Sequence, residues 1–584
     1  MYKWLETKRN HNIHCAISST LVCYGFFKEE KRVSQIFSAK ERSEIIKEMG
    51  NEEHDLLIIG GGITGSGIAF DAASRGMKTA LVEMQDISAG TSSRSTKLVH
   101  GGLRYLKQFE FKMVSEVGKE RAVVYENGPH VTTPEWMMLP LYEGGTFGKL
   151  STSFGLRLYD YLAGVKKSEY RSMLSKKEAL AKEPSLKKKG LKGAGYYVEY
   201  RTDDSRLTIE VLKEAIKLGA KAVNYARVLS FLYENEKAVG VTVLDQLTGK
   251  TKKIRAKQVI NATGPWGDIL REKDNSKKGK QLRLTKGVHI VFDQSKFPLR
   301  QAVYYDTPDG RMVFAVPRDG KTYVGTTDTN YNEDIANPKM LKEDLDYIID
   351  SIHFMFPDLS VSKEDVESSW AGLRPLIHEK GKDPSEISRK DEIWFSESGI
   401  MTIAGGKLTG YRKMAEQIVD SVVKKFKEEN LGSFKPCRTK NMPISGGHVG
   451  GSQKFPQFIE KKVFEYKDLN LSPGELEFLA KRYGSNVDII VDLIKNGTEK
   501  INSFSLSPFV YGMLQYAIDY EMTVTPTDFF QRRTGAILFD RRSVEEWKDK
   551  VIHFMGEELG WDEQEKQKNT KELHDQFKQA VTAY

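Results

Sequence analysis

The sequence predicts three parts in one chain: an α/β nucleotide-binding domain of the Rossmann type, an antiparallel-sheet cap of α+β character and a C-terminal α-helical domain. A strand, a glycine turn, a helix and a second strand follow one another over residues 54–83. Period-two alternation with turn residues covers residues 283–328, and helical periodicity dominates after residue 430. The chain has 584 residues. Since one core stops growing at roughly 250–300 residues, two or three domains are expected.

Residues 54–83 predict a dinucleotide site. Gly60, Gly62 and Gly65 have the spacing G-x-G-x-x-G between a predicted strand and a predicted helix. The first glycine permits a tight turn, the second lets backbone approach a pyrophosphate, and the third lets helix and strand touch. Glu83 ends the next strand, where a carboxylate accepts hydrogen bonds from a ribose diol. This unit alone leaves open whether the dinucleotide is NAD or FAD.

Composition narrows the kinds of partner and site. Lys and Arg number 89 against 80 Asp and Glu, a net charge of +9. That excess favours acidic small substrates or anionic lipid surfaces, but alone it supports little. No basic stripe interleaved with aromatic residues is present, so nucleic acid is not expected as a partner. Cys15, Cys23 and Cys437 have no metal-ligand spacing, so the sequence predicts no metal site and a reducing compartment.

The first 36 residues carry no motif and are expected to be an extension of unknown role. Residues 15–27 form an apolar run too short to span a bilayer, and no small-x-small cleavage site follows it. A weak interfacial anchor, a poorly ordered extension and an upstream start codon misassigned as the first residue stay open, with the last two favoured. Helical periodicity from residue 37 leads into the nucleotide-binding unit.

The segment after Glu83 is expected to be a loop that faces a ligand. Its string GTSSRSTK is rich in hydroxyls and offers donors to a second phosphate or to a ring edge. HGGLRY then brings together His100, Arg104 and Tyr105, with glycines that let backbone lie against a flat group. The alternative is a surface loop with a solvated arginine.

Longer strings carry a resemblance to a known family. GGGITGSGIAFDAASRGMKTALVEMQDISAGTSSRSTKLVHGGLRYL resembles the FAD-dependent, membrane-associated glycerol-3-phosphate dehydrogenases of bacteria. The resemblance continues through YRTDDSRL, INATGPW, TKGVHIVF, VGTTDT, WAGLRPL, AGGKLTGYRK and TPTDFFQRRTG, and covers nearly everything from about residue 37 onward. It implies an FAD-binding Rossmann-like domain, an antiparallel-sheet substrate cap and a C-terminal α-helical domain.

The expected division of the chain has seven segments. An N-terminal extension (1–36) precedes an FAD-binding domain in three parts (37–130, 199–280 and 365–430). The substrate cap is in two parts (131–198 and 281–364), and the C-terminal helical domain is the last (431–584).

Periodicity predicts the elements within these segments in chain order. A strand (55–59) and a helix (63–74) build the nucleotide-binding unit, whereas residues 131–195 show no clear rhythm. Next come a helix (208–218), a strand (223–226), an antiparallel pair (around 238–245 and 252–264), an antiparallel sheet (283–328), a helix (341–356), a strand and turn (368–376), and a strand, glycine turn and helix (401–426). The predicted C-terminal helices are 473–482, 487–496, 509–521 and 542–556. TPTDFFQRRT (525–534) is expected to cap and dock the helical domain.

The resemblance implies that FAD is the cofactor. It implies that INATGPW approaches the flavin from behind and that AGGKLTG cradles its pyrimidine edge and pyrophosphate, where a helix start adds a positive field. The residues expected to bind the cofactor are Gly60, Gly62, Thr64, Gly65, Glu83, Thr91, Ser92, Ser93, Lys97, Leu98, His100, Gly102, Arg227, Val228, Thr263, Gly264, Trp266, Gly405, Gly406, Lys407, Leu408 and Thr409.

A phosphorylated substrate needs several charged donors, and arginine forks fit phosphate oxygens best. The resemblance puts Arg104, Arg374, Arg389 and Lys407 in active-site motifs, with Tyr105 as a neutral donor. Four cations together favour a phosphate over a carboxylate.

Three residues are candidates for catalysis. His289 and His100 both suit general-base work near neutral pH, and His289 is slightly favoured. Arg374 is a poor base but can stabilise a forming alkoxide.

The implied activity is oxidation of sn-glycerol 3-phosphate to glycerone (dihydroxyacetone) phosphate in glycerol catabolism. Hydride passes to FAD N5 and electrons to a membrane quinone, menaquinone or ubiquinone. A cytoplasmic protein peripherally bound to the inner face of the cytoplasmic membrane is implied, and a homodimer is allowed. Three alternatives stay open: a glycerol-3-phosphate oxidase that uses oxygen, an amine or amino-acid oxidase, and a flavin-binding redox sensor or scaffold. The oxidase that uses oxygen is disfavoured, because this sequence has no long cap insertion.

Overall fold

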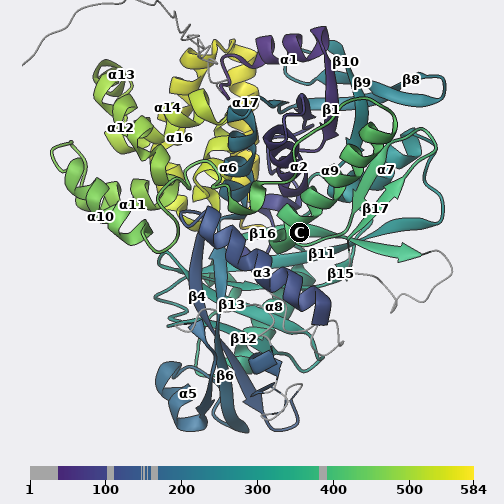
Figure 1. Cartoon of the computed structure of the whole chain (residues 1–584). Coiled ribbons are helices and arrows are strands. Elements are labelled where there is room, and N and C mark those ends of the chain that lie inside the picture. Colours follow the sequence, from purple (N-terminus) through teal and green to yellow (C-terminus); the bar gives the residue numbers. More distant parts are fainter. Residues whose placement is uncertain are drawn as a thin grey trace, which may run out of the picture. The chain divides into compact units, whose positions relative to one another are not determined.

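The computed structural model describes residues 37–100, 111–145, 148, 152–153, 155–158, 169–379 and 391–584. Gln35–Tyr584 form one compact unit. Two sheets organise this unit, and the C-terminal helices, coloured green to yellow, lie beside them (Figure 1). The observed architecture therefore has the three predicted parts, a nucleotide-binding sheet, a cap sheet and a set of C-terminal helices.

The nucleotide-binding sheet has eight strands among the described residues. Its central strand β1 pairs in parallel with β10 and β2, while β10 pairs in parallel with β18 and antiparallel with β9. The predicted antiparallel pair is thus confirmed. The strands are β17 (Glu392–Phe395), β18 (Met401–Ala404), β10 (Thr251–Asn261), β1 (Glu53–Ile59), β2 (Thr79–Val82), β7 (Lys221–Val223), β8 (Ala226–Glu234) and β9 (Lys237–Asp245).

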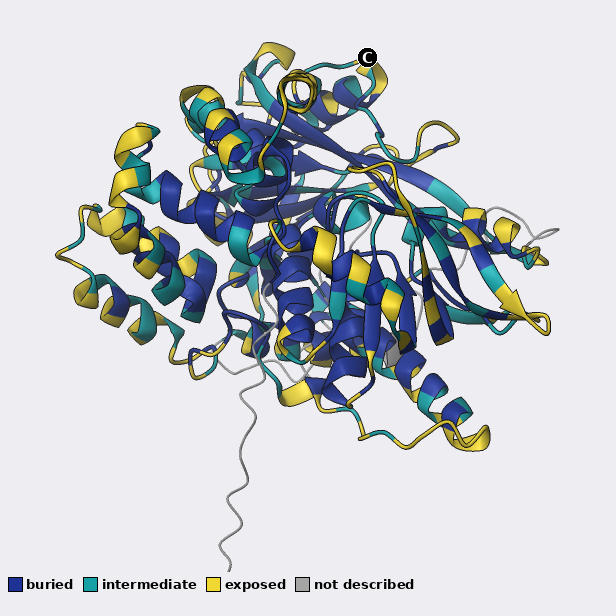
Figure 2. Cartoon of the chain, turned by 90° about the horizontal axis from the view of Figure 1, so that it is seen from above, coloured by how far each residue is buried: buried dark blue, intermediate teal, exposed yellow. Residues whose placement is uncertain are grey.

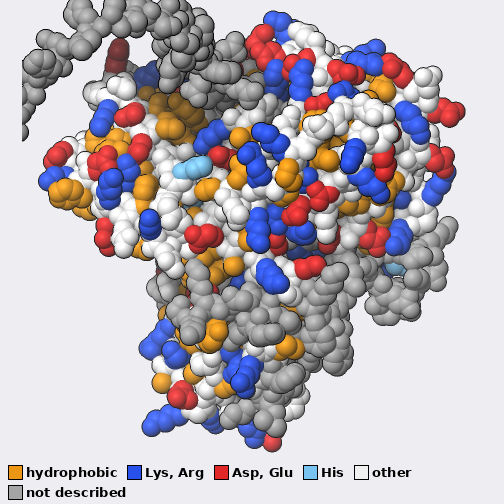
Figure 3. Space-filling view, viewed as in Figure 1, with side chains coloured by type: hydrophobic (Ala, Val, Ile, Leu, Met, Phe, Trp, Pro, Cys, Tyr) orange, Lys and Arg blue, Asp and Glu red, His pale blue; other side chains and the backbone are white. Residues whose placement is uncertain are grey.

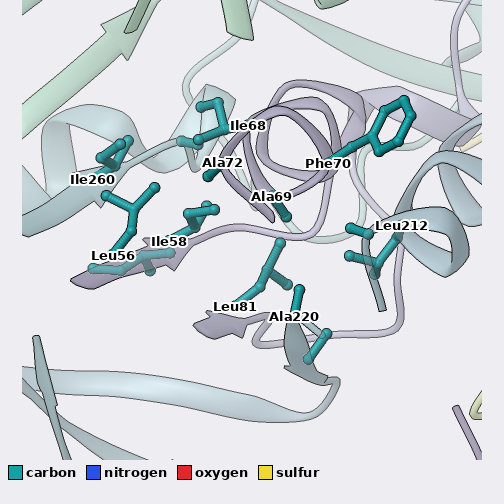
Figure 4. Close-up of a cluster of buried hydrophobic side chains, with 14 of the residues drawn as sticks. Leu56, Ile58, Ile68, Ala69, Phe70, Ala72, Leu81, Leu212, Ala220 and Ile260 are labelled. Carbon is teal, nitrogen blue, oxygen red and sulfur yellow. The ribbon is translucent and has the colours of Figure 1, made fainter. Parts of the chain in front are cut away.

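Helix α2 (Ile63–Ser74) has the predicted bounds and packs directly on this sheet. Its alanines and glycines let it approach the strands closely; Ala69 points toward Ile58 and Leu81 of β1 and β2, and Ile68 lies on the side of Ile260 of β10 (Figure 4). The central strands and α2 are buried, whereas exposed residues lie on outer helices and loops (Figure 2). The other helices of this part are α1 (Arg42–Asn51), α6 (Asp204–Lys217), α7 (Gly267–Lys273) and α9 (Tyr411–Glu428).

The cap sheet has ten strands among the described residues and is mainly antiparallel, as predicted for residues 283–328. β12 and β4 form a parallel contact within it. Its strands are β15 (Thr329–Asn330), β11 (Lys280–Asp293), β14 (Lys321–Gly325), β13 (Met312–Arg318), β12 (Ala302–Asp306), β4 (Thr132–Tyr142), β6 (Leu191–Thr202), β3 (Leu98–Val99), β16 (Val366–Glu379) and β5 (Ser172–Ser175). The helices of this region are α3 (Phe111–Asn127), α5 (Lys176–Lys182) and α8 (Lys342–Met355).

Two long strands lie where the sequence predicted no regular pattern. β4 and β6 pair antiparallel along their whole length. Residues 137–141 of β4 are buried one after another, so the alternation that marks a one-sided strand is absent there. Burial on both faces thus hid these strands from the periodicity analysis.

The four predicted C-terminal helices are confirmed as α11 (Pro473–Tyr483), α12 (Val487–Asn496), α14 (Pro508–Tyr520) and α16 (Arg541–Leu559), and α12 has the predicted bounds. The others, α10 (Phe455–Glu465), α13 (Thr498–Ser503), α15 (Ala536–Phe539) and α17 (Glu563–Gln579), were not predicted. One hydrophobic cluster includes residues of these helices and of the cap sheet, among them Ile490 and Leu514 of the helices and Met137 and Tyr197 of the sheet. Because this cluster spans predicted segments, it draws no boundary between them, and the seven-segment division stays a prediction.

The distribution of surface charge and the length and polarity of the helices are relevant to the expected partners. On the face shown in Figure 3, basic and acidic side chains are interspersed. None of the helices among the described residues has the length and apolar character needed to cross a membrane.

Candidate active site

The glycine turn after β1 depends on the absence of side chains. Gly60 has φ +113°, and a Cβ there would lie 2.6 Å from the carbonyl oxygen of Ala262. A Cβ on Gly65 would lie 1.9 Å from the carbonyl oxygen of Gly60. The first glycine thus permits the turn and the third lets the helix touch the strand, as predicted. The first N–H groups of α2 have no partner within the helix, and that of Ile63 donates to Ser92 Oγ at 2.9 Å.

Glu83 follows β2 and is tied to the glycine turn. Its carboxylate accepts hydrogen bonds from the backbone N–H groups of Gly61, at 2.7 Å, and Gln85, at 2.8 Å. Burial raises the pKa of Glu83, while these N–H groups oppose the rise. The acid is therefore held at the end of β2 beside the turn.

A cavity of about 780 Å³ opens at this edge of the sheet. The turn after β1, the end of β2, the start of β8 and two further glycine turns form its wall. Of the residues expected to bind a cofactor, it is lined by Gly60, Gly62, Thr64, Glu83, Thr91, Ser92, Arg227, Val228, Thr263, Gly264, Trp266, Gly405, Gly406, Lys407 and Leu408.

A second cavity of about 660 Å³ lies under the cap sheet and shares part of its wall with the first. Both are lined by Thr91, Ser95, Pro375 and residues 405–408. The second cavity is also lined by Leu98, His100, His289, Arg374 and Thr409. The structure thus brings the predicted catalytic candidates to one cavity next to the first.

Arg374 lies within strand β16 rather than at the end of it. The predicted strand within 368–376 is confirmed, but the predicted turn is wrong, because β16 continues through Pro375 to Glu379. β16 pairs only with β11 among the described strands, and a proline is tolerated on an edge strand. Arg374 donates to Thr326 Oγ1 at 2.9 Å and lies 3.3 Å from an Asp328 carboxylate oxygen.

His289 is buried on β11. Its ring stacks on Trp370 with centroids 4.7 Å apart, and Nε2 lies 3.2 Å from Thr96 Oγ1. Nδ1 has no hydrogen-bond partner among the described residues. Burial, together with the charges of Arg374 and Lys97, lowers the pKa of His289 well below its usual value. The imidazole is therefore neutral at neutral pH.

Comparison with known proteins then places the chain. A family model described as "FAD dependent oxidoreductase" matches residues 55–412, and one described as "C-terminal domain of alpha-glycerophosphate oxidase" matches residues 437–566. The aerobic glycerol-3-phosphate dehydrogenase of Bacillus subtilis is 64% identical over 545 residues, 93% of this chain and 98% of that protein. The chain belongs to the aerobic glycerol-3-phosphate dehydrogenase family.

Other members of this dehydrogenase family agree in sequence and in fold. The enzyme of the same name from Staphylococcus aureus (strain USA300) is 57% identical over 545 residues, covering 93% of this chain and 98% of that protein. The structure of the glycerol-3-phosphate dehydrogenase from Bacillus halodurans, complexed with FAD, has a TM-score of 0.82 at 50% identity and covers 94% of this chain and 99% of that one. The predicted fold class is confirmed.

The residues of the first cavity fit the FAD of this dehydrogenase family. A Cβ on Gly62 would lie 3.1 Å from Ser92 Oγ, so backbone forms that part of the wall. The start of α2 provides N–H groups and a positive field for a pyrophosphate, and Glu83 provides an acceptor for a ribose diol. Each of these chemical needs has a residue at the cavity.

Three residues expected to bind FAD lie behind the wall instead. Gly65 serves helix packing, and Ser93 Oγ lies 3.5 Å from the carbonyl oxygen of Gly90. Lys97 is buried, with Nζ 2.7 Å from Asp204 Oδ1, and lines neither cavity. Its ammonium group is committed to a buried carboxylate and supports the loop.

The backbone of His100 is held by Thr409, which is remote from it in sequence. Its backbone N–H donates to Thr409 Oγ1 at 3.0 Å, and that hydroxyl donates to its carbonyl oxygen at 3.1 Å. Burial, with the Lys407 and Arg121 charges, lowers the pKa of His100 to about 3. Four predicted residues, Gly102, Arg104, Tyr105 and Arg389, lie outside the described residues.

The sequence analysis missed several residues of the second cavity. Arg94 lines it and donates to the carbonyl oxygen of Ala336 at 3.1 Å, and burial lowers the pKa of this arginine to about 10. Thr96 contacts His289, and Thr326 contacts Arg374. The strings GTSSRSTK and VGTTDT contained these residues, but nothing in their spacing distinguished one hydroxyl from another.

No group of three or more His, Cys, Asp or Glu side chains suited to a metal occurs in the described part of the chain.

The arginine pair of TPTDFFQRRT has a structural role. Arg532 Nε lies 2.5 Å and Arg533 Nη1 2.6 Å from Asp86 Oδ2, and all three side chains are buried. Met84, Gln85, Ala89 and Gly90 around Asp86 line the first cavity. The expected docking role is thus observed, and its partner is a loop of the cofactor cavity.

Proposed function

We propose that this protein oxidises sn-glycerol 3-phosphate to glycerone phosphate with FAD as its cofactor. The observation that carries the proposal is the second cavity, because cations and neutral histidines line it directly beside the cavity that fits FAD. The names of relatives 64% and 57% identical support the same substrate. The glycine turns and Glu83 of the first cavity would hold FAD, which would supply the hydride acceptor for oxidation of the carbinol carbon.

The cations of the second cavity would bind the phosphate. Arg374 and Lys407 line it, and a guanidinium held by Thr326 has a preset direction. The Asp328 carboxylate partly balances the charge of the Arg374 guanidinium when no substrate is bound. The substrate phosphate would then replace the Asp328 carboxylate as the partner of Arg374. Arg104, Arg389 and Tyr105, outside the described residues, complete the proposed phosphate pocket by resemblance. Arg374 also has the charge needed to stabilise a forming alkoxide.

His289 is proposed to accept the hydroxyl proton. A general base must be unprotonated before the reaction, and burial and neighbouring cations keep the imidazole neutral. The unbonded Nδ1 leaves acceptor capacity that a buried nitrogen normally uses. A substrate dianion beside Arg374 would offset the guanidinium charge and raise the pKa of His289. His100 is the second candidate, on the same cavity.

The proposed electron acceptor is a membrane quinone, menaquinone or ubiquinone, which makes the enzyme a quinone-dependent glycerol-3-phosphate dehydrogenase (EC 1.1.5.3). A cytoplasmic protein, peripheral on the inner face of the cytoplasmic membrane and forming homodimers, belongs to the same proposal. The net charge of +9 supports attraction to anionic lipid. Oxygen is a second candidate acceptor, favoured by the C-terminal match that is described by an oxidase.

Anaerobic titration of the holoenzyme tests the substrate. Glycerol 3-phosphate should bleach the flavin absorbance, whereas glycine and sarcosine should not. Bleaching by an amine alone would indicate an amine oxidase, and no bleaching would indicate a redox sensor or scaffold. Reoxidation of the reduced enzyme by a menaquinone analogue, compared with air, then separates a dehydrogenase from an oxidase.

A further inference from the structure

A third cavity, of about 1030 Å³, lies between the cap sheet and the C-terminal helices. The β13–β14 turn and the start of β16 line one side, and α11, α14 and the start of α16 line the other. None of its lining residues lines either cavity of the candidate active site. Its volume lies just above the range for small-molecule sites, roughly 300–1,000 Å³.

The deep part of this cavity is apolar and aromatic. Phe529, Phe530 and Val510 are buried, with exposed fractions of 2%, 2% and 5%. Phe478 and Phe509 meet edge to face with centroids 5.4 Å apart, and Phe478 is 42% exposed. The lining therefore runs from an apolar depth to an aromatic residue at the surface, which suits an apolar body.

The rim carries cationic side chains. Arg541 and Arg542 begin α16, and neither has a carboxylate within salt-bridge distance among the described residues. Cations are disfavoured by the field at a helix start, so an anion is needed to balance them. Arg318 also lines the cavity and is buried, and its Nη1 has no hydrogen-bond partner among the described residues.

The carboxylates of the lining are already engaged. Asp293 and Glu367 both pair with Lys321, at 2.8 Å and 2.6 Å. Asp319 lies 3.3 Å from Arg318 Nε. Glu475 accepts from the Ser472 hydroxyl at 2.7 Å, and Asp540 caps α16 through Ser543 at 3.3 Å. Each of the five lining carboxylates thus has a hydrogen-bond or ion-pair partner, whereas Arg541 and Arg542 have no carboxylate partner among the described residues. Arg541 also donates to the carbonyl oxygen of Phe577 at 3.0 Å.

We infer that this cavity binds an amphipathic anion, an apolar body that carries one phosphate or carboxylate, with the body against the phenylalanines and the anion at Arg541 and Arg542. The two sources of such a molecule are a free acyl or alkyl anion and an anionic lipid headgroup with its chain. All the lining residues come from one chain, so a single dissolved molecule is expected to bind without a membrane surface.

The cavity also touches the candidate active site through one layer of side chains. Phe539 lies in its lining, and its ring is 5.9 Å from that of Trp370. Trp370 stacks on His289 at 4.7 Å. A ligand that presses on Phe539 can therefore change the setting of His289 without entering the substrate cavity.

Calorimetric titration of the holoenzyme with monomeric dodecyl phosphate tests the inference. Binding is expected, at least about tenfold weaker binding of neutral dodecanol, and no measurable binding of inorganic phosphate. Equal affinity for dodecanol, or equal affinity for inorganic phosphate, would overturn the amphipathic site. Binding to dodecyl phosphate alone would support the site with a free anion as its source, and binding to both dodecyl phosphate and phosphatidylglycerol vesicles would support it with a lipid as its source. Binding to the vesicles with none to dodecyl phosphate would overturn the site in favour of a lipid surface.

Two variants localise the binding. Arg541→Gln/Arg542→Gln should weaken dodecyl phosphate binding at least about tenfold and leave dodecanol unchanged. Lys548→Gln/Lys571→Gln removes the same charge from positions that do not line the cavity and should change neither. A Cβ at Gly474 meets no atom within 4 Å, so Gly474→Leu should fill the cavity without a clash and weaken both ligands. Unchanged binding in the arginine variant and in Gly474→Leu would place the ligand elsewhere and sink the proposal.

Discussion

Arg374 owes its position to a missing side chain on the neighbouring strand. Gly287 on β11 faces Gly372 on β16, and a Cβ on Gly287 would lie 2.4 Å from Arg374 Nη2. Gly325 does the same for His289, since its Cβ would lie 2.3 Å from the imidazole ring. At this scale, two glycines of the cap sheet hold open the space for the proposed phosphate and proton contacts.

Arg374→Ala should remove a charge-assisted hydrogen bond worth about 1.5–3 kcal/mol in the proposed pocket. We expect kcat/KM for glycerol 3-phosphate to fall by about ten- to over a hundredfold while FAD stays bound. Arg283→Ala on β11 is the matched control, because Arg283 bonds Asn330 near the surface and lines neither cavity. Steady-state kinetics and the flavin spectrum measure both effects, and unchanged kinetics would remove Arg374 from the pocket.

His289→Ala should flatten the pH dependence of flavin reduction. The pKa of His289 is lowered, so the native imidazole is neutral at neutral pH and rates fall only when acid protonates it. The bound substrate dianion should raise the pKa of His289. Because kcat reports the substrate complex and kcat/KM the free enzyme, the acidic limb of kcat should lie at higher pH than that of kcat/KM. Anaerobic stopped-flow reduction across the pH range checks this. An acidic limb that survives in the variant would assign the base to His100.

At the scale of elements, α2 and its turn act as one piece. The helix is buried almost along its whole length, and its first residues are bonded to neighbouring loops. Ile63 N–H donates to Ser92 Oγ at 2.9 Å, and Ser88 N–H donates to the carbonyl oxygen of Gly61 at 3.1 Å. The loop after Glu83 therefore sets where the phosphate-binding end of α2 lies.

Gly65→Ala should disrupt this piece. The added methyl would lie 1.9 Å from the Gly60 carbonyl oxygen, so α2 must move away from β1. Overpacking of this kind costs about 1–3 kcal/mol, and FAD affinity should fall because the helix start shifts. Gly556→Ala in α16 is the control, since its Cβ would make an ordinary 3.5 Å contact with Trp561. It should stabilise the protein by about 0.5–1 kcal/mol. Urea unfolding measures the stability of the Gly65→Ala and Gly556→Ala variants, and FAD retention measures their cofactor affinity. Equal FAD affinity in the two variants would contradict the role of Gly65 in placing α2.

At the scale of the whole molecule, buried ion pairs join the C-terminal helices to the cofactor loop. Arg533 bonds Asp86 and also donates to the carbonyl oxygen of Glu521 at 2.7 Å. Arg206 of α6 lies 2.7 Å from both carboxylate oxygens of Glu521. The network links three segments remote in sequence, so the helical part and the nucleotide-binding part are expected to unfold together.

Arg533→Gln should destabilise the protein by about 3–5 kcal/mol, because it leaves the buried Asp86 with one fewer charge partner. The FAD dissociation constant should rise as well, since residues beside Asp86 line the first cavity. Lys462→Gln breaks the Lys462–Asp488 pair within the helices and is the control, with FAD affinity expected to stay as in the native protein. Chemical denaturation and flavin fluorescence separate the two effects. A variant that loses stability but keeps native FAD affinity would exclude the link to the cofactor loop.

Asp86 also predicts a pH dependence of stability. Burial alone would raise its pKa, but the guanidinia of Arg533 and Arg532 lower it from 3.8 to about 2. The carboxylate therefore contributes stability that is present above pH 3.8 and lost as the pH falls toward about 2. Asp86→Asn should lose this acid dependence. Melting temperatures of both proteins over that range check it, and identical slopes would exclude Asp86 as the cause.

The sequence by itself determined the local features of this protein. The glycine spacing, the bounds of α2 and α12 and the antiparallel pair of β9 and β10 follow from patterns that span a few residues. Resemblance of long strings was enough to predict the family and the fold class. These features need no knowledge of which distant segments meet.

Tertiary structure alone decided which remote side chains share a cavity. Trp370 behind His289, Thr326 beside Arg374 and Asp86 beside Arg533 are contacts between segments far apart in the chain. The continuous strand through Pro375 and the buried β4 were likewise hidden, because edge position and two-sided burial depend on neighbours from elsewhere in the chain. A short-range pattern records one element's own preference, whereas packing between elements sets the charge and shape of a site.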